Sequence, residues 1–180
     1  MSRTAPALRV WTPGDLLTAA YMNAVNYAVT FAALNRPQCL AYQTITQPIS
    51  SSATALTANK MLWDTELVDS DGFHSTSSNT SRFVAPWAAW YDLDGIVGMA
   101  TISSGRKGGQ WAINGTAVAQ TLVLLHDDGT TGGSLSMAST TQYLNAGDYA
   151  ELWGVQDSGS AVNTTTGANG SFARILFGSF

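Results

Sequence analysis

Charge is what this sequence has least of. It has eight basic and twelve acidic residues, so only 20 of 180 residues carry charge, or 11%, against roughly 25% in typical soluble domains. Serine and threonine together number 39, so hydroxyl groups must supply much of the solvation of the surface. Neighbouring copies can cover such a surface without desolvating many ions. The composition therefore favours repeated assembly over a free enzyme.

Other absences disfavour whole classes of protein. The net charge is −4 and the basic residues are scattered, which leaves no positive stripe to neutralise a phosphate backbone. No apolar run approaches the roughly 18 residues that a membrane span needs. The first ten residues lack the apolar core of a signal peptide. We therefore expect neither nucleic acid nor membrane as a partner, and we expect the chain to be made and folded inside a cell.

Residues that carry chemistry are also scarce. Cys39 is the single cysteine, which excludes an intramolecular disulfide and is interpreted as a small buried hydrophobe. His74 and His126 stand in no metal-binding or catalytic spacing. The segment 69–72 (DSDG) begins like a calcium loop but lacks the closing carboxylate, so we interpret it as a solvated acidic loop. We interpret 126–129 (HDDG) as a hairpin turn. We predict no enzyme activity, no cofactor and no metal.

The sequence begins with an extended arm and one helix. Turn formers end any structure before Thr18, which is a suitable N-cap for a helix over 19–34. Residues 35–37 (NRP) end this helix because proline cannot continue it. The spacings of four, three and four place one stripe on the helix, formed by Tyr21, Val25, Ala28 and Ala32. A helix of about four turns is not stable alone in water, so the stripe needs a partner in the same chain, in other proteins or in symmetry copies.

Short strands separated by small polar residues follow from Cys39 onward. Ten strands are predicted, at 40–47, 60–63, 82–84, 89–93, 96–103, 109–113, 121–126, 134–143, 148–155 and 172–177. Their number and spacing favour a β-sandwich or barrel, and Asn114-Gly115 is the strongest hairpin signal. Leu152 and Trp153 fall on opposite faces of one strand, so burial of both faces would indicate contact between copies. The predicted organisation is an N-terminal segment over 1–38 and a β domain over 39–180.

A series of short motifs covers about two thirds of the chain, from 59 to 115 and from 144 to 176. They are 63–64 (WD), 69–74 (DSDGFH), 82–91 (RFVAPWAAWY), 105–106 (GR), 113–115 (ING), 144–149 (LNAGDY) and 171–176 (SFARIL). In this order they resemble the globular heads of the complement and tumour necrosis factor superfamily as they occur in phage proteins. The stretch 83–91 looks like that family's F-x-x-P-x-x-G-x-Y strand pair, with Ala89 where glycine is usual. The resemblance implies a mainly β, jelly-roll sandwich that assembles as a homotrimer.

The segment 11–23 (WTPGDLLTAAYMN) carries a second resemblance. It looks like the opening G-(D/E)-x-L-T-A-x-x-(L/M)-N of phage tail and head appendage proteins, which implies that it attaches the protein to the particle while the β domain projects outward. The expected anchor contacts are Trp11, Leu16, Leu17, Tyr21, Val25, Ala28 and Ala32. The expected contacts of the jelly-roll core or trimer interface are Phe83, Trp87, Trp90, Tyr91, Trp153 and Phe172.

The leading hypothesis from these resemblances is a virion structural protein of a bacteriophage, assembled in the cytoplasm of the host bacterium. It would be a capsid decoration protein, a head fibre or a minor tail protein, with the major capsid or tail proteins as partners. The alternative is a tail-tip receptor-binding module that uses aromatic residues and polar loops to bind host surface glycan. A glycan-cleaving tailspike is disfavoured, because the sequence is short and has no repetitive β-helix pattern.

Overall fold

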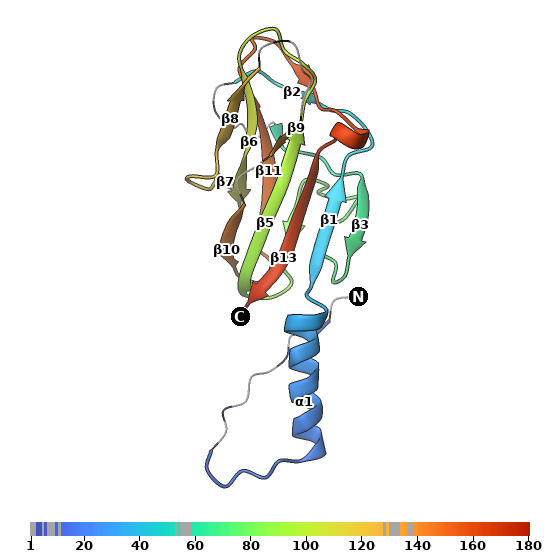
Figure 1. The fold of residues 1–180 in the computed structure, drawn as a ribbon, viewed down its shortest axis with the longest axis vertical. Helices are drawn as coiled ribbons and strands as arrows, with labels where there is room; N and C mark the ends of the chain where they lie inside the picture. The colour runs from blue at the N-terminus through green and yellow to red at the C-terminus, as the bar shows by residue number, and fades with distance from the viewer. Residues whose placement is uncertain are drawn as a thin grey trace.

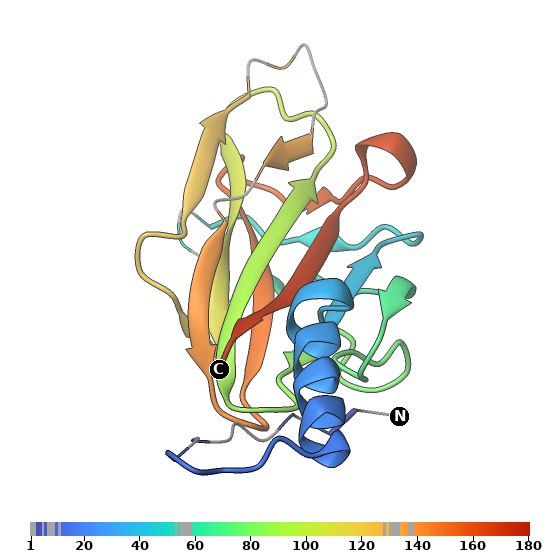
Figure 2. The ribbon, with the colours of Figure 1, turned by 60° about the horizontal axis from the view of Figure 1, so that its bottom comes forward.

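The computed structural model describes residues 3–4, 6, 10, 12–52, 54, 59–127, 129, 134–136 and 139–180, with the backbone alone at 32, 34, 134–136 and 169. A β-sandwich forms the upper part and one helix projects below it (Figure 1). Seen with the lower end forward, the helix stands in front of the base of the sandwich (Figure 2). The arrangement separates a slender N-terminal segment from a broad β domain.

The helix α1 spans Ala19–Val29 and begins where the sequence predicts. The Thr18 side chain accepts a hydrogen bond from the backbone nitrogen of Tyr21, which satisfies one of the free N–H groups of the first turn. The predicted helix continues to residue 34, but its last turn is the π-helix η1, Thr30–Leu34. The backbone nitrogen of Asn35 donates to the carbonyl of Thr30 at 2.7 Å and closes that wider turn.

The described strands form two antiparallel sheets and one short ribbon. The first sheet contains β1 (Gln38–Tyr42), β3 (Thr65–Asp69), β5 (Ala89–Gly98), β9 (Ser134–Ser136), β10 (Thr140–Leu144) and β13 (Phe172–Ser179). Its order is β10-β5-β13-β1-β3, with β9 also beside β5. The second sheet contains β4 (Phe83–Val84), β6 (Arg106–Ile113), β7 (Thr116–Ala117), β8 (Val123–His126) and β11 (Tyr149–Gln156).

The second sheet has the order β4-β11-β6-β7, with β8 also beside β6. The ribbon pairs β2 (Pro48–Ile49) with β12 (Val162–Asn163), and a 3-10 turn, η3 (Gly167–Asn169), precedes β13. Strands far apart in sequence lie side by side, such as β1 and β13. This crossing connectivity of two facing antiparallel sheets is that of a jelly-roll sandwich (Figure 1), so the predicted fold class is confirmed.

Aromatic side chains fill the space between the sheets. The largest fully buried side chains include Trp63, Trp111, Tyr91, Phe73 and Phe83. Successive residues of a strand point to opposite faces of the sheet, so every second residue of a strand points into the core. In β13, for example, the second, fourth and sixth residues are buried while their neighbours are not. Each buried aromatic removes a large apolar area from water, which is the main favourable term in the stability of the domain.

The hairpin predicted at Asn114-Gly115 is confirmed. These residues have φ of 50° and 77° and connect β6 to β7. Both values lie in the left-handed region that a tight two-residue hairpin turn requires, and asparagine and glycine reach it most easily.

Several predicted strands are wrong in their bounds. The strand predicted at 40–47 ends at Tyr42, since β1 is Gln38–Tyr42. The strands at 89–93 and 96–103 are one continuous strand, β5. Gly95 makes no turn within it; a Cβ atom there would lie 2.9 Å from the Leu152 side chain and 3.0 Å from the Phe172 carbonyl oxygen. This glycine lets the sheets approach. The stretch 134–143 is divided into β9 and β10.

The predicted strand at 60–63 is also wrong. Only Lys60 bridges to β11, opposite Trp153, and the strand of this region is β3, a few residues later. The strand β3 lies at the edge of the first sheet and carries exposed Leu67. Its exposed side chains do not alternate between apolar and polar, so the sequence pattern gives no signal for it.

Burial of both faces of β11 needs no second copy. Leu152 and Glu151 are both fully buried within one chain. The Glu151 carboxylate lies 3.1 Å from the Lys60 Nζ and 3.4 Å from the Arg82 Nε, and it accepts a hydrogen bond from the Ser81 hydroxyl at 2.9 Å. The expectation that such burial indicates contact between copies is therefore wrong for this strand.

Candidate functional site

One face of the first sheet points away from the core of the sandwich, and we call it the outer face. It consists of the outward-pointing residues of β1, β5, β10 and β13. The register places Tyr42, Phe172 and Ile96 side by side in one row and Leu40, Arg174 and Asp94 in the next. The outer face is formed by Gln38, Leu40, Tyr42, Trp90, Asp92, Asp94, Ile96, Thr141, Tyr143, Phe172, Arg174 and Leu176.

Both ends of the outer face are apolar. At one end Trp90 and Tyr143 are 46% and 49% exposed, with ring centroids 5.5 Å apart. At the other end Tyr42, Ile96 and Phe172 line a hollow of about 400 Å³. Large aromatic side chains that remain exposed are characteristic of the centre of protein interfaces. The outer face therefore has the shape and chemistry to be covered by another protein surface.

The charges on the outer face are paired within the chain. Arg174 binds the Asp94 carboxylate, which also accepts a hydrogen bond from Ser139, and Arg36 lies 3.3 Å from Asp92. Burial raises the pKa of Asp94, but the hydrogen bonds from Ser139 and Arg174 outweigh it and keep the pKa below its ordinary value. A paired charge costs less to cover than an isolated one, so the outer face can become an interface without leaving an unpaired ion.

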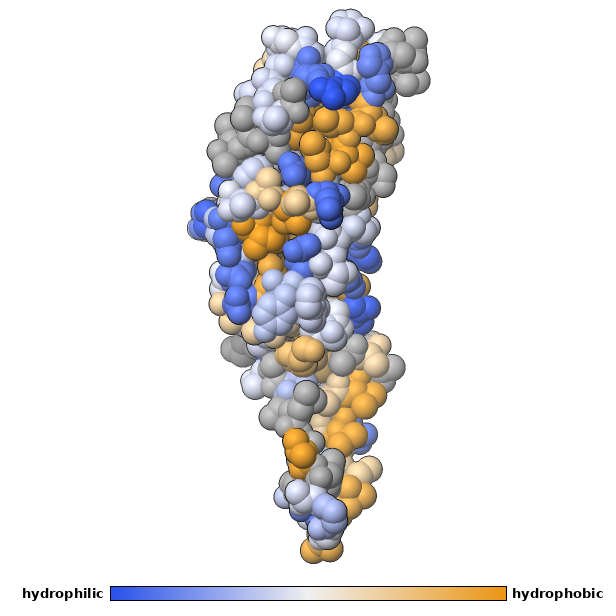
Figure 3. Space-filling model, turned by 90° about the vertical axis from the view of Figure 1, so that its left-hand side faces the viewer, coloured by the Kyte–Doolittle hydropathy of each residue, from blue (hydrophilic) through white to orange (hydrophobic). Residues whose placement is uncertain are grey.

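Below the sandwich, the arm and α1 expose apolar side chains. No residue of α1 is buried, and apolar surface covers much of this lower end (Figure 3). The exposed apolar residues there include Val10, Leu16, Leu17, Met22, Val25, Tyr27 and Val29. A helix with apolar residues on several sides and none buried has no complete partner within its own chain.

The predicted anchor residues have different surroundings. Leu16, Leu17 and Val25 are 80%, 66% and 44% exposed, whereas Tyr21 and Ala28 are half-buried. Trp11 lies outside the described residues, and only the backbone of Ala32 is described. The predicted stripe on the helix is therefore open to solvent at Val25, and the anchor role of these residues stays a prediction.

Phe31 joins the helix to the β domain, and sequence analysis missed it. It is 1% exposed, and its ring lies 5.1 Å from that of Trp87, 5.4 Å from that of Phe177 and 6.0 Å from that of Phe180. It lies beside the predicted stripe, three residues after Ala28. Its partners at the end of β13 could not be inferred from helical spacing.

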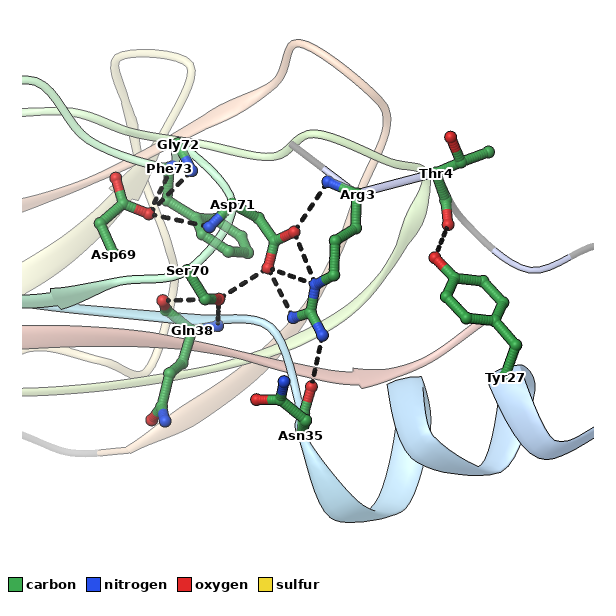
Figure 4. Close-up of polar contacts among 10 residues, drawn as sticks. All are labelled: Arg3, Thr4, Tyr27, Asn35, Gln38, Asp69, Ser70, Asp71, Gly72 and Phe73. Carbon is green, nitrogen blue, oxygen red and sulfur yellow. Dashed lines mark hydrogen bonds and ion pairs between the residues drawn. The ribbon is translucent and has the colours of Figure 1, made fainter. Parts of the chain in front are cut away.

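The N-terminal arm is bound to the base of the sandwich through Arg3 (Figure 4). The Arg3 guanidinium donates to both oxygens of Asp71, with the shortest contact at 2.7 Å, and to the carbonyl of Asn35 at 2.9 Å. The Tyr27 hydroxyl donates to the carbonyl of Thr4 at 2.5 Å. Asp71 is 1% exposed. We call the Arg3–Asp71 pair the latch.

The latch corrects the interpretation of 69–72 as a solvated acidic loop. Asp71 is buried and paired, and Asp69 accepts hydrogen bonds from the backbone nitrogens of Gly72, Phe73 and His74 at 2.9, 3.0 and 3.0 Å. Both carboxylates thus have structural partners. The partner of Asp71 lies 68 residues away, beyond the reach of any local pattern.

The 126–129 turn also contains a buried ion pair. Lys107 Nζ lies 2.6 Å from the Asp127 carboxylate, and both side chains are almost inaccessible. Hydrogen bonds from Lys107 and from the backbone of Ile102 hold the pKa of Asp127 at about 2. The pair ties the residue after β8 to β6, so the Asp127 carboxylate is not a solvated one.

Acid should release the arm. Burial alone would raise the pKa of Asp71, but hydrogen bonds from Arg3 and Ser70 outweigh it and lower the pKa below its ordinary value. Because the pKa of Asp71 is lower in the folded chain than in the unfolded chain, its ionised carboxylate stabilises the latch at pH values above the unfolded pKa of about 4. This stabilisation is lost as the pH falls through the folded-state pKa of Asp71. We expect the Arg3 Nε–H resonance to be shifted from its free position at neutral pH and to return to it in acid. In Asp71→Asn the resonance should stay near the free position at every pH; a wild-type shift in that variant would contradict the latch.

The aromatic residues predicted for the core or the trimer interface lie partly in the core and partly at the surface. Phe83, Tyr91 and Trp153 are buried in the domain. Trp90 and Phe172 lie on the outer face, and Trp87 is half-buried against Phe31. The structure thus brings two of the six to the same exposed sheet face.

The described part of the chain gives no sign of a metal centre or membrane helix. Within it, no three His, Cys, Asp or Glu side chains come together in a group that could hold a metal ion. None of its helices has the length and apolar character needed to cross a membrane. Cys39 is buried and its pKa is raised, chiefly by burial, as for an unreactive core thiol.

Solved structures share this fold, although no protein-family model and no curated protein matches the sequence. The structure of murine APRIL at pH 5.0 gives a TM-score of 0.54 at 7% identity, over 79% of this chain and 99% of that chain. A structure of murine APRIL at pH 8.0 gives 0.50 at 7% identity, with the same shares covered. The globular domain of zebrafish complement 1qA protein gives 0.46 at 12% identity, over 77% of this chain and 94% of that chain. The likeness to APRIL shows that the β domain shares the fold of that protein.

Proposed function

We propose that this chain is a non-enzymatic structural protein of a bacteriophage particle that works as a homotrimer. The observation that carries the trimer is the outer face, where aromatic side chains are exposed at one end and line a hollow at the other. Heads of the superfamily that the sequence resembles form threefold bundles. A closed threefold arrangement would cover all three outer faces at once and leave no surface for further growth.

The assignment to a phage particle rests on the resemblance of 11–23 to the opening of phage appendage proteins. The exposed apolar side chains of the arm and α1 support an anchor at 1–38. In this proposal the protein is a capsid decoration protein, a head fibre or a minor tail protein, assembled in the host cytoplasm and bound to the major capsid or tail proteins. The β domain over 39–180 is displayed outward.

The trimer is tested by placing charge on the outer face. Ile96→Glu should convert a species of three times the chain mass into monomer, because three carboxylates would be buried near one axis without partners. Mass in solution is measured by light scattering after size exclusion. Leu125→Glu is the matched control, since Leu125 is 50% exposed on the other sheet. A monomeric wild type, or a trimer that survives Ile96→Glu, would refute the outer face as the interface.

The anchor is tested with the two most exposed leucines of the arm. Replacing both Leu16 and Leu17 with aspartate should abolish binding to particles of the encoding phage that lack the protein, while the melting temperature stays unchanged. Both side chains are largely exposed in the free chain, so the change removes contacts with the particle and not with the β domain. Thr12→Asp is the control in the same arm. Wild-type decoration by the double variant would exclude the arm as the anchor.

A further inference from the structure

One side of α1 carries a row of apolar residues that is open to solvent. Met22, Val25 and Val29 are 44%, 44% and 50% exposed. They follow one another at spacings of three and four residues, which places them on one stripe of a helix. We call these three residues the open stripe. It lies beside the stripe predicted from the sequence and shares Val25 with it.

Phe31 fixes the direction in which the open stripe points. A helix turns by about 100° per residue, so Met22 and Val29 lie on the side of the helix opposite Phe31. The Phe31 ring packs on Phe177, whose side chain points from β13 into the core. The helix continues into β1, which lies beside β13 in the same sheet. The open stripe is therefore turned away from the core, in the same direction as the outer face.

The outer face and the helix are also close along the chain. Only residues 35–37 separate the helical segment from Gln38, which belongs to the outer face. An extended chain advances by at most about 3.5 Å per residue, so the last helical residue lies within about 14 Å of Gln38. The first sheet is the nearer one in Figure 1, and that near side lies at the right in Figure 3, where apolar atoms follow the edge of the lower end. A molecule that covers the outer face thus also reaches the helix.

The helix has no charge that would oppose contact with a copy of itself. The sequence contains no charged residue between Asp15 and Arg36. Like charges repel when identical helices lie side by side in parallel, and this helix has none to bring together. Asn23 is exposed on a different side of the helix from the open stripe. The helix therefore has one apolar side that suits contact with identical helices and one polar side that suits water.

We propose that α1 packs through the open stripe against the α1 helices of two other copies, in a parallel three-helix bundle below the β domains. The inference rests on the proposed trimer and names the partner of the helix within it. Spacings of three and four residues are those of the a and d positions of a coiled coil. A trimer that covers the three outer faces brings three helices to one axis, where the bundle removes their apolar side chains from water.

The bundle also accounts for a helix that could not persist alone. The helix α1 has eleven residues and none of them is buried, whereas isolated helices shorter than about 12–15 residues are marginal in water. Contact with two other helices stabilises it. Leu16 and Leu17 precede the helix, so three copies of this pair lie together at the lower end and can bind a particle at three points.

Hydrogen exchange of the full-length protein, without phage particles, tests the bundle. The amides of α1 should exchange slowly in the wild type. Val25→Asp should accelerate their exchange by about tenfold or more, because three carboxylates would meet near one axis. Asn23→Asp is the matched control, since it places the same side chain on the polar side and should leave the exchange unchanged. Both variants should keep three times the chain mass in light scattering, because the outer face is intact.

Cross-linking gives an independent measurement. Cys39 is buried, so Val25→Cys supplies the accessible thiol of the chain. A mild oxidant should join two thiols of neighbouring copies into a disulfide, which non-reducing gel electrophoresis detects as a pair of chains. The same substitution at the polar side, Asn23→Cys, should give far less of this product.

The outcomes separate the bundle from the trimer. Fast exchange in the wild type, equal exchange in the two aspartate variants, or equal cross-linking at positions 23 and 25 would overturn the bundle, while a trimeric mass would leave the proposed trimer standing. Protection of α1 that arises only when particles are added would assign the open stripe to a particle protein and would also overturn the bundle. A monomeric wild type would overturn both proposals.

Discussion

Replacing Phe31 with alanine should detach the helix from the β domain. Phe31 is 1% exposed, and its ring meets three aromatic side chains of the β domain, Trp87, Phe177 and Phe180. Truncation of a buried phenylalanine typically costs about 3–5 kcal/mol, partly from lost transfer free energy and partly from the cavity left behind. The loss falls on the contact between helix and sandwich, so we expect a lower melting temperature together with fast hydrogen exchange in α1.

The matched control for this prediction lies two residues earlier. Val29 is 50% exposed, so Val29→Ala should change the free energy of unfolding by no more than about 0.5 kcal/mol. Phe31→Leu should fall between the two variants, because it keeps apolar volume but loses the ring contacts. Thermal unfolding followed by circular dichroism and amide exchange measured by mass spectrometry give the two readouts. Equal behaviour of Phe31→Ala and Val29→Ala would show that the helix is held in another way.

Gly108→Ala should severely destabilise the β domain. A Cβ atom at Gly108 would lie 1.8 Å from the carbonyl oxygen of Val123 and 2.8 Å from its carbonyl carbon. Both are backbone atoms of the first residue of β8, so no side-chain rotation can relieve the clash. The strand β8 must therefore move away from β6. Movement of β8 also strains the buried Lys107–Asp127 pair. A destabilisation above about 4 kcal/mol is expected, a range reserved for disrupted cores and buried networks.

Gly154→Ala is the control for this substitution. Gly154 is also a buried strand glycine of the second sheet, but the nearest atoms to its Cβ would all belong to side chains, those of Ile49 at 3.1 and 3.3 Å and of Met99 at 3.2 Å. Flexible side-chain ends can shift, so the loss should be clearly smaller. Soluble yield and thermal midpoint are compared for the two proteins. If Gly108→Ala is as soluble and stable as Gly154→Ala, the close approach of β8 to β6 is wrong.

The sequence predicts correctly those elements that are determined by residues close together in the chain. The Thr18 cap and the Asn114-Gly115 turn depend on residues within a few positions, and both lie where expected. Gly95 shows the limit of this reasoning. Its neighbour Asp94 makes the pair look like a turn, whereas the glycine serves the close approach of Leu152 from the opposite sheet. The sequence around position 95 contains no trace of that contact.

The candidate site was less predictable, because its contacts are distant in the chain. The latch joins residues 68 positions apart, and Phe31 meets the C-terminal strand β13 and Phe180. The outer face is assembled by the register of four strands, so its composition appears only when β1 and β13 are known to be neighbours. The sequence pattern identifies Trp90 and Phe172 but not Leu40, Tyr42, Ile96 and Leu176. An apolar residue in a strand looks the same in the sequence whether it points into the core or onto the outer face.

The position of β1 governs how a particle-bound head would carry mechanical load. The helix leads into Gln38 at the lower end of β1, and β1 is hydrogen-bonded on one side to β13 and on the other to β3. A pull transmitted through the helix acts along the strand axis, so both ladders are sheared together and must break nearly at once. Strands loaded at right angles would instead open one bond at a time. In the proposed particle-bound state, this connection would make the junction between helix and β domain resistant to mechanical unfolding.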